Sequence, residues 1–425
     1  MPPRESVSHT TTDSATDPAT DPATDPATDP AADPSAGPAP GRPVPFFTQA
    51  VSFEEAWPDI RARVSEVIDD GKYSHGRQVG RLETALAEWT GARHCVAVNS
   101  GTDALVLLLR ACGLEAGQEV VVPAFSFIAT ASSVVLAGGR PAFADIDPVT
   151  YALDPRSAAD AVTERTAMLM PVHLFCQMAD MGALAQVARR HGLTLVEDSA
   201  EAIGMRWDGV HAGLLGAGGV LSFFPTKTLG AIGDAGAILT DDARIAETAA
   251  ALRHHGRTGR TLAHFPGISN ATELNGVNSK MDDLQAAVLL AKLPRLAHAV
   301  RRRAELAAVY TERLRGIPGL LRLPTLAPRG VATDAVFYVY LIEAERRDAL
   351  VDHLAAHGVG TETYYPVPLH LQPCFSELGH KRGEFPNAEA ACERTVALPF
   401  HPDLTTADID TVCDLIRRFY TGRAA

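Results

Sequence analysis

The chain has 425 residues, of which 46% are hydrophobic and 21% charged, so it is long enough to bury one large core and a smaller one. Its formal net charge of −13 argues against nucleic acid as a partner, because a phosphate backbone repels an acidic surface. Six scattered cysteines without a Cys-x-x-Cys pair predict reduced thiols and neither a disulfide framework nor a zinc site.

Residues 1–42 differ in composition from the rest of the chain. Between Asp13 and Pro34 the motif Thr-Asp-Pro-Ala repeats with almost no side chain large enough to build a core, and the regular prolines block a helix. We therefore predict that residues 1–42 are disordered. The segment has no basic stretch followed by an apolar one, so it does not predict a secretory signal. Together with the reduced thiols, this indicates a cytoplasmic protein.

One apolar window, residues 120–139, raises the question of a membrane span. It contains Pro123 and several hydroxyl side chains. Its β-branched first part and alanine-rich second part predict a buried strand that leads into a helix. We expect no transmembrane helix and no membrane partner.

From about Thr90 onward, short β-branched runs alternate with helical stretches. This alternation predicts an α/β fold with a doubly wound, mostly parallel sheet that helices cover on both faces. The predicted strands are His94–Val98, Glu119–Pro123, Pro141–Ile146, Ala167–His173, Thr194–Glu197, Val220–Phe224 and Ala237–Thr240. The predicted helices between them are Ala104–Ala111, Ala129–Ala137, Met181–His191 and Ala243–His254.

A second, shorter alternation follows. Its predicted elements are a long helical stretch from Met281 to Leu314, a strand at Val336–Ile342, a helix at Arg347–His357 and a closing helix at Ala407–Tyr420. We expect a large α/β domain over residues 43–296 and a smaller C-terminal α+β domain over residues 297–425. In such an architecture a ligand binds beyond the carboxyl ends of the large-domain strands.

The strongest chemical signal is the segment Ser222-Phe223-Phe224-Pro225-Thr226-Lys227, which follows a predicted buried strand and precedes a glycine-rich stretch. Burial at this place would lower the pKa of Lys227 and free a nucleophilic amine, as a Schiff-base lysine requires. An isolated lysine is more often a surface residue on a tight turn. The neighbouring motifs are what favour the catalytic interpretation.

Two of these motifs follow other strands. Asp198, in Glu197-Asp198-Ser199-Ala200, ends a predicted strand, where its carboxylate can pair with a protonated pyridine nitrogen or cap a helix. The N–H groups of Gly101 and Thr102 open a predicted helix and can bind a phosphate, although Ser-Gly-Thr is equally a capping sequence. Ser222 offers a further hydroxyl group to that phosphate.

Two phenylalanines lie between the second predicted strand and the following helix. Phe127 begins the helix and faces the strand ends, so its ring can lie against a flat cofactor ring, a contact worth about 1 kcal/mol beyond burial. Phe125 is predicted to belong to the core.

Together these motifs resemble those of the DegT/DnrJ/StrS-type sugar-nucleotide aminotransferases, a branch of the fold type I enzymes that use pyridoxal 5′-phosphate (PLP). The resemblance runs from about Val44 to Phe419. It is carried by Ser100-Gly101-Thr102-Asp103-Ala104-Leu105, Glu197-Asp198-Ser199-Ala200, Ser222-Phe223-Phe224-Pro225-Thr226-Lys227 and Gly276-Val277-Asn278-Ser279-Lys280-Met281-Asp282-Asp283-Leu284-Gln285-Ala286-Ala287. Four motifs in the same order are far more specific than any one of them.

The resemblance implies a role for each candidate residue. Lys227 holds PLP as a Schiff base, Asp198 binds the pyridine nitrogen, and Phe127 stacks on the ring. The residues implied to hold the phosphate are Gly101, Thr102, Ser222 and, from a neighbouring subunit, Asn278. The active unit is thus expected to be a homodimer with shared active sites. Contacts to the sugar nucleotide are implied for Tyr73, His173, Tyr365 and His370, each with a purely structural place in the core or on the surface as the alternative.

Two positions depart from the family pattern. Glu201 stands near the cofactor where the family commonly has Gln or His, and some relatives that aminate C4 of the sugar also carry Glu there. Lys280 stands where relatives that aminate C3 usually have Arg. The two positions point in different directions, so the sequence leaves the position of amination open.

The resemblance implies a transaminase that moves an amino group from L-glutamate to a 3-keto- or 4-keto-deoxysugar linked to a nucleotide, expected to be dTDP. Such a reaction belongs to aminosugar biosynthesis for antibiotics or surface glycans. The alternatives on the same fold are a ketocyclitol aminotransferase, a PLP-dependent sugar dehydratase and a catalytically silent regulator. Relatives that are dehydratases replace the lysine with His, so Lys227 argues against that alternative. An intact Lys227, Asp198 and Thr102 argue against the regulator.

Overall fold

The computed structural model describes residues 42–261, 270–272 and 274–422. The predicted disorder of residues 1–42 therefore lies outside the described residues, apart from Arg42. From Arg42 onward the chain packs as one compact unit. The division into domains 43–296 and 297–425 stays a prediction.

The larger sheet is mostly parallel, as the sequence predicted. Its strands are β1 (His94–Val98), β2 (Glu119–Pro123), β3 (Arg140–Ala144), β4 (Thr166–Leu169), β5 (Thr194–Leu195), β6 (Glu197–Asp198), β9 (Gly219–Ser222) and β10 (Gly236–Thr240). One part runs in the parallel order β3-β2-β4-β5, and the other in the order β1-β10-β9-β6, with β10 antiparallel to both of its neighbours. The N–H of Val196 donates to Leu169 and that of Asp198 to Pro171, so hydrogen bonds continue from one part to the other.

The alternation of side chains explains why both faces of this sheet are covered. Val96 and Val98 lie in one apolar cluster, whereas Ala97 between them lies in another on the opposite face. In β10, Ile238 joins the first cluster and Leu239 the second. Strands that are apolar on both faces are stable only between two layers of helices.

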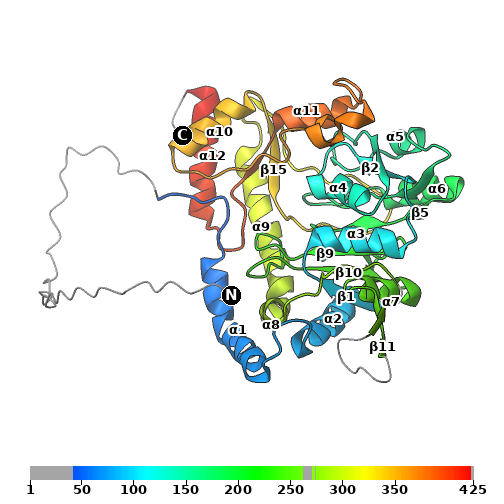
Figure 1. Ribbon diagram of the computed structural model, residues 1–425. Helices are drawn as coiled ribbons and strands as arrows, with labels where there is room; N and C mark the ends of the chain where they lie inside the picture. Colours follow the sequence, from blue (N-terminus) through cyan, green and yellow to red (C-terminus); the bar gives the residue numbers. More distant parts are fainter. Residues whose placement is uncertain (1–41, 262–269, 273, 423–425) are drawn as a thin grey trace, which may run out of the picture. The chain divides into compact units, whose positions relative to one another are not determined.

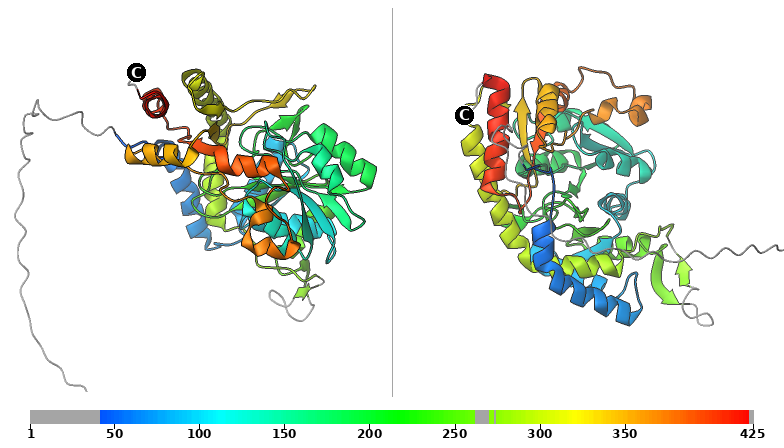
Figure 2. Two further views of the ribbon diagram at one scale, coloured as in Figure 1. Left: turned by 90° about the horizontal axis from the view of Figure 1, so that it is seen from above. Right: turned by 90° about the vertical axis from the view of Figure 1, so that its left-hand side faces the viewer.

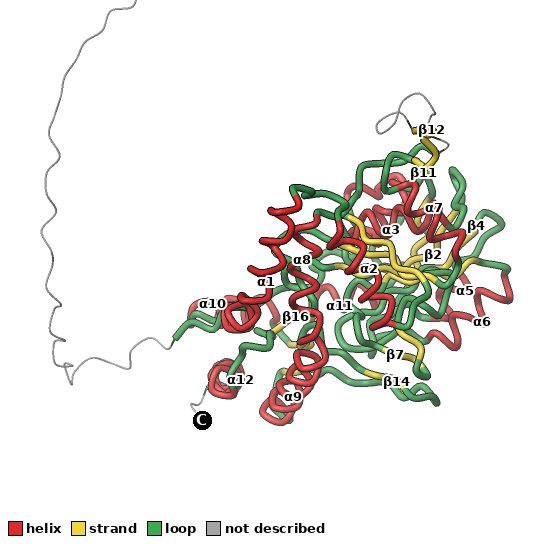
Figure 3. Tube along the Cα trace, turned by 90° about the horizontal axis from the view of Figure 1, so that it is seen from below, coloured by secondary structure: helices red, strands yellow, loops and turns green. Residues whose placement is uncertain are grey.

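The helices form these two layers, on opposite faces of the strands (Figures 1 and 3). The cluster on one face includes residues of α3 (Gly101–Ala111), α4 (Ile128–Leu136) and α7 (Ala243–Leu252). The clusters on the other face include residues of α2 (Arg77–Thr90), α5 (Pro155–Asp160), α6 (Met181–His191) and α8 (Asp283–Lys292). The doubly wound α/β architecture of the prediction is confirmed.

A smaller antiparallel sheet and three helices enclose a separate apolar cluster. The sheet has the order β13-β15-β16, with β13 (Leu320–Arg322), β15 (Tyr340–Ala344) and β16 (Thr395–Leu398). The helices are α9 (Leu296–Leu314), α10 (Arg347–Ala356) and α12 (Thr406–Thr421). Figure 2 shows α12, in red, lying beside the long helix α9.

The remaining elements connect these two parts or flank them. They are α1 (Ala50–Asp70), α11 (Pro386–Arg394), β7 (Arg206–Trp207), β8 (Val210–His211), β11 (Arg257–Thr261), β12 (Asn270–Thr272), β14 (Thr333–Asp334) and the 3₁₀ helices η1 (Leu293–Arg295), η2 (Leu369–Leu371) and η3 (Pro373–Leu378). In the described part of the chain, no helix is both long and apolar enough to cross a membrane.

Three sequence-based assignments need correction. The predicted strand Val336–Ile342 begins only at Tyr340, because Val336 and Tyr338 donate their N–H groups to the loop carbonyls of Cys176 and Phe175 instead of to a sheet neighbour. The predicted strand Ala167–His173 ends at Leu169, and the one at Thr194–Glu197 is divided into β5 and β6. Helices α1 and α2 had not been assigned.

Candidate active site

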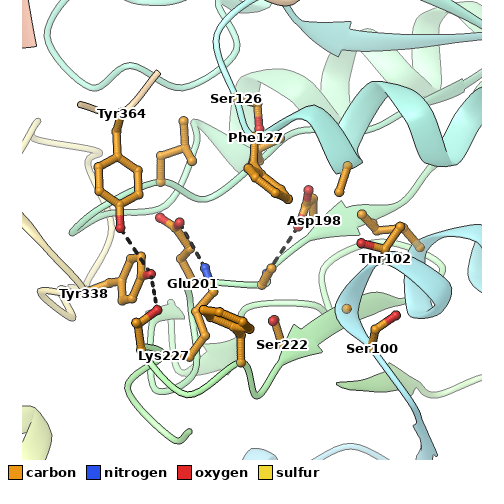
Figure 4. A pocket seen from close by; sticks show the side chains of 18 of the residues that line it. Ser100, Thr102, Ser126, Phe127, Asp198, Glu201, Ser222, Lys227, Tyr338 and Tyr364 are labelled. Carbon is orange, nitrogen blue, oxygen red and sulfur yellow. Dashed lines mark hydrogen bonds and ion pairs between the residues drawn. The ribbon is translucent and has the colours of Figure 1, made fainter. Parts of the chain in front are cut away.

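A cavity of about 460 Å³ lies at the carboxyl ends of the parallel strands β2 and β6, beside the N-terminus of α3. The candidate residues that line it are Gly101, Thr102, Phe127, Asp198, Glu201, Ser222, Lys227 and Tyr365. In Figure 4, Ser100, Thr102 and Ser222 lie together on one side of the cavity, and Tyr338 and Tyr364 lie on the other. The structure therefore gathers most of the predicted cofactor-binding side chains around one space.

Lys227 lies in the loop between β9 and β10. Its side chain is largely buried, and its Nζ atom lies 3.1 Å from Oε1 of Glu201 and 4.2 Å from the ring centre of Tyr338. Burial is the largest single influence and would lower the pKa of Lys227, but the charge and hydrogen bond of Glu201, together with Tyr338 and Asp198, outweigh it, so the net effect raises that pKa. The sequence-based expectation of a lowered pKa is wrong for the protein groups alone, because it assumed that no carboxylate lay nearby.

Glu201 is fixed by a second contact. Its Oε2 atom accepts a hydrogen bond of 3.1 Å from the N–H of Phe175, and only 7% of the residue is exposed. A carboxylate held at both oxygens can keep the amine of Lys227 in one place.

Asp198 ends strand β6 and is buried. Its Oδ2 atom accepts a hydrogen bond of 2.8 Å from the hydroxyl of Thr130, which in turn accepts one of 2.7 Å from Ser126. Burial raises the pKa of Asp198, and the bond from Thr130 partly offsets this. No helix begins directly after Asp198, so the alternative of a helix cap does not apply.

The N-terminus of α3 is compatible with both predicted roles of Ser-Gly-Thr, a helix cap and a phosphate-binding site. The hydroxyl of Ser100 caps the helix by accepting the N–H of Asp103 at 3.1 Å. Gly101 and Thr102 remain at the cavity wall. A Cβ atom on Gly101 would lie 2.9 Å from Cβ of Ser222, so any larger residue would fill the space between the helix N-terminus and this hydroxyl.

This donor set fits PLP. Hydroxyl groups and a helix N-terminus, which bind anions, lie at one side, and a buried carboxylate and an amine lie farther along the same cavity. The ring of Phe127, 56% exposed, lies at the cavity wall, whereas Phe125 is fully buried, as predicted.

Two predicted substrate contacts are not supported. The ring of His173 is fully buried: its Nε2 donates to Glu197 at 2.9 Å and its Nδ1 accepts the N–H of Ala179 at 3.2 Å. His370 is likewise buried, 3.2 Å from Glu389. Neither lines the cavity, so the structural alternative applies to both.

Tyr73 and Asn278 are exposed and lie outside the cavity lining. Asn278 accepts a hydrogen bond from Lys280. Their implied contacts to the substrate and to a neighbouring subunit stay predictions.

Tyr338 also lines the cavity, although the sequence does not predict it. Its hydroxyl lies 3.2 Å from that of Thr226 and 3.4 Å from that of Tyr364. The pattern around Tyr338 is that of a buried strand and gives no chemical signal. The residue reaches the cavity only because its N–H pairs with the loop at Phe175.

Residues 55–417 match the model of the DegT/DnrJ/EryC1/StrS aminotransferase family. The chain belongs to this family. The predicted resemblance and fold type are thus confirmed, and this aminotransferase depends on PLP, as members of the family do.

The proteins similar to this chain include a regulatory protein and a transaminase. The chain is 40% identical to a pleiotropic regulatory protein of Geobacillus stearothermophilus, over 89% of the chain and 98% of the relative. It is 38% identical to the dTDP-3-amino-3,4,6-trideoxy-alpha-D-glucose transaminase of Streptomyces venezuelae, over 88% and 96%. Among solved structures, DesV of S. venezuelae in complex with a ketimine intermediate matches with a TM-score of 0.83 and 38% identity, over 90% of this aminotransferase and all of that chain.

Proposed function

We propose that this aminotransferase moves an amino group from L-glutamate to the keto carbon of a nucleotide-linked deoxysugar. The proposal rests on one observation: Lys227, Asp198 and the N-terminus of α3 all line the same cavity. The sugar nucleotide is favoured because a relative that spans nearly the whole chain is a dTDP-aminosugar transaminase.

PLP supplies an electron sink and carries the amino group between the two substrates. Lys227 would hold it covalently and, once released, would move protons as base and acid at the reacting carbon. Asp198, oriented by Thr130, would pair with the protonated pyridine nitrogen. Phe127 would pack against the ring.

The remaining contacts divide between phosphate and substrates. Gly101, Thr102 and Ser222 would hold the phosphate, and Glu201 would fix the amine of Lys227. The hydroxyl of Tyr365 would face the sugar.

The proposal includes a second copy of the chain. Asn278 of one copy would reach the phosphate of the other in a cytoplasmic homodimer, and Tyr73 would meet the substrate. Both side chains are exposed and outside the cavity of their own copy, which supports their use between copies.

The test uses purified protein with PLP, L-glutamate and a panel of 3-keto and 4-keto dTDP-sugars, a UDP-linked ketosugar and a ketocyclitol, with aminated product detected by mass. We expect product from one nucleotide-linked member, which also assigns the position of amination. Lys227→Ala should abolish both turnover and the borohydride-trapped cofactor adduct. Turnover retained by Lys227→Ala would refute the assignment of Lys227.

Because the chain is similar to a pleiotropic regulatory protein, the test must also distinguish a regulatory function. A catalytically silent regulator would give no product from any panel member and no pyridoxamine phosphate when glutamate is added to the PLP-loaded protein. The conversion of PLP by glutamate alone therefore separates the two functions without knowledge of the sugar.

A further inference from the structure

Hydrogen bonds within its own backbone hold the loop that contains Lys227. The N–H of Lys227 donates to the carbonyl of Phe224 and that of Ala231 to the carbonyl of Phe223, both at 2.8 Å. Gly230 packs so closely that a Cβ atom there would lie 2.3 Å from the carbonyl oxygen of Pro225. The backbone of residues 223–231 therefore determines where the side chain of Lys227 begins.

Two side chains from distant parts of the chain contact this loop. The carbonyl of Pro225 accepts a hydrogen bond of 2.8 Å from Nε2 of Gln49, and that of Gly230 accepts one of 2.5 Å from Nζ of Lys292. Lys292 also donates to Oε1 of Gln49 at 2.7 Å. The Gln49–Lys292 pair thus joins the beginning of the loop to its end.

Lys292 is an unusual residue for this place. In the described part of the chain it forms no ion pair, and the acceptors of its ammonium group are two amide oxygens. Burial lowers the pKa of Lys292 to about 8, and the charge of Asp403 offsets this only in part. A mostly buried ammonium without a carboxylate partner is costly for folding, which points to a role for Lys292 other than stabilising the fold.

The pair has rigid support on both sides. Gln49 immediately precedes α1, and the N–H groups of Val51 and Ser52 in the first turn of α1 donate to the carboxylate of Asp403. Lys292 is the last residue of α8, which packs against α1 through the small cluster of Ala56, Ile60, Val288 and Ala291. Two packed helices therefore determine the position of the loop carbonyls.

We propose that Gln49 and Lys292 are positioning residues that hold the loop of residues 223–231, so that the amine of Lys227 meets PLP in the productive place. Neither residue lines the cavity, so both act through the backbone and not on the cofactor. The inference rests on the proposed attachment of PLP to Lys227.

The first variant is Lys292→Met, which keeps the length of the side chain and removes its charge and its donors. Its matched control is Arg295→Met. Arg295 also joins this part of the chain to α1, through the carbonyl of Glu55 and the carboxylate of Asp59, but it does not touch the loop. Loss of general support for α1 would thus affect both variants, and loss of loop positioning only the first.

The first measurement is amide hydrogen exchange over residues 223–231 in the full-length protein, with and without PLP. We expect Lys292→Met to exchange about tenfold faster there, the effect of one hydrogen bond to a charged donor, and Arg295→Met to match the wild type. Because this measurement does not need the cofactor, it tests the pair even if the wild type takes up no PLP. A wild-type protein that takes up no PLP would overturn the proposed function without deciding the role of Gln49 and Lys292.

The second measurement is the rate at which added PLP forms the borohydride-trapped adduct on Lys227. We expect Lys292→Met to be about tenfold slower, and Lys292→Arg, which keeps the charge and the donors, to stay within about threefold of the wild type. If Lys292→Met fails to fold, Gln49→Met makes the same test, because it removes both contacts of Gln49. Wild-type exchange and attachment rates in a folded Lys292→Met or Gln49→Met protein would overturn the inference, as would equal changes in Arg295→Met.

Discussion

The Nζ atom of Lys227 lies 3.1 Å from Oε1 of Glu201, and this contact raises the pKa of the lysine although the lysine is largely buried. Glu201→Gln keeps the shape of the side chain but removes its charge, so the pKa of Lys227 should fall. At pH 8 in protein without cofactor, we expect Lys227 to be acylated by acetic anhydride about tenfold faster, because a larger fraction of its amine is unprotonated. Mass spectrometry of the Lys227 peptide measures the rate. The exposed Glu377→Gln is the control, and equal rates in all three proteins would contradict the prediction.

Asp198 tests the proposed contact with the pyridine nitrogen. Asp198→Asn keeps the acceptor for Thr130 but loses the charge, so we expect kcat to fall by about 100-fold or more, with the fold intact. Thr130→Val, which removes only the orienting hydroxyl, should lower kcat by about tenfold. Steady-state kinetics with glutamate and the accepted ketosugar provide both numbers. Activity of Asp198→Asn within threefold of the wild type would exclude the proposed role.

Gly101 tests the predicted phosphate site. In Gly101→Ala the new methyl group would lie 2.9 Å from Cβ of Ser222, and we expect the affinity for PLP to fall about tenfold or more. The double variant Gly101→Ala/Ser222→Gly removes the clash but also a hydroxyl, so its affinity should recover only in part. Fluorescence titration with PLP measures the affinity. Gly80→Ala, where the added methyl meets nothing within 4 Å, is the matched control.

His211 should give stability a pH dependence. Burial lowers its pKa to about 4, and the ring accepts the N–H of Gly204 at Nε2 and donates to the carbonyl of Ala212 from Nδ1. The folded state therefore keeps His211 neutral, while the unfolded state binds a proton below its ordinary pKa of about 6.5. The contribution to stability is present above that value and is lost as the pH falls toward 4.

We accordingly expect the free energy of unfolding to fall by about 2 kcal/mol between pH 7 and pH 5 because of His211. Urea denaturation at the two pH values measures the difference. In His211→Gln, which does not titrate, the fall should be smaller by about this amount, and an unchanged fall would contradict the assignment.

The sequence predicted the large sheet well, because the information needed is local. Residues such as Val96, Ala97 and Val98 alternate between two faces, so strand β1 is apolar on both. Alternation of this kind is visible in five residues. The places of Lys227, Asp198 and Gly101 follow, because Asp198 ends β6, and Gly101 and Lys227 follow β1 and β9 of the same sheet by a few residues.

The sequence failed where a residue depends on a distant partner. His173 has the same position after a strand as the cavity residues, yet it turns away because Glu197, on the neighbouring strand, accepts its Nε2–H in the core. The sequence predicts that Tyr338 belongs to a strand. Its N–H instead donates to the carbonyl of Phe175, far away in the sequence, and its side chain lines the cavity.

By itself, then, the sequence determined the α/β architecture and the family, and it proposed the lysine that holds PLP, because periodicity and strand-end motifs act over a few residues. Only the tertiary structure decided that Glu201 contacts the amine of Lys227, that His173 and His370 belong to the core, and that Gln49 and Lys292 reach the loop of residues 223–231. These are pairings of buried polar groups. Which partner such a group finds depends on how separate elements pack, and no local pattern encodes it.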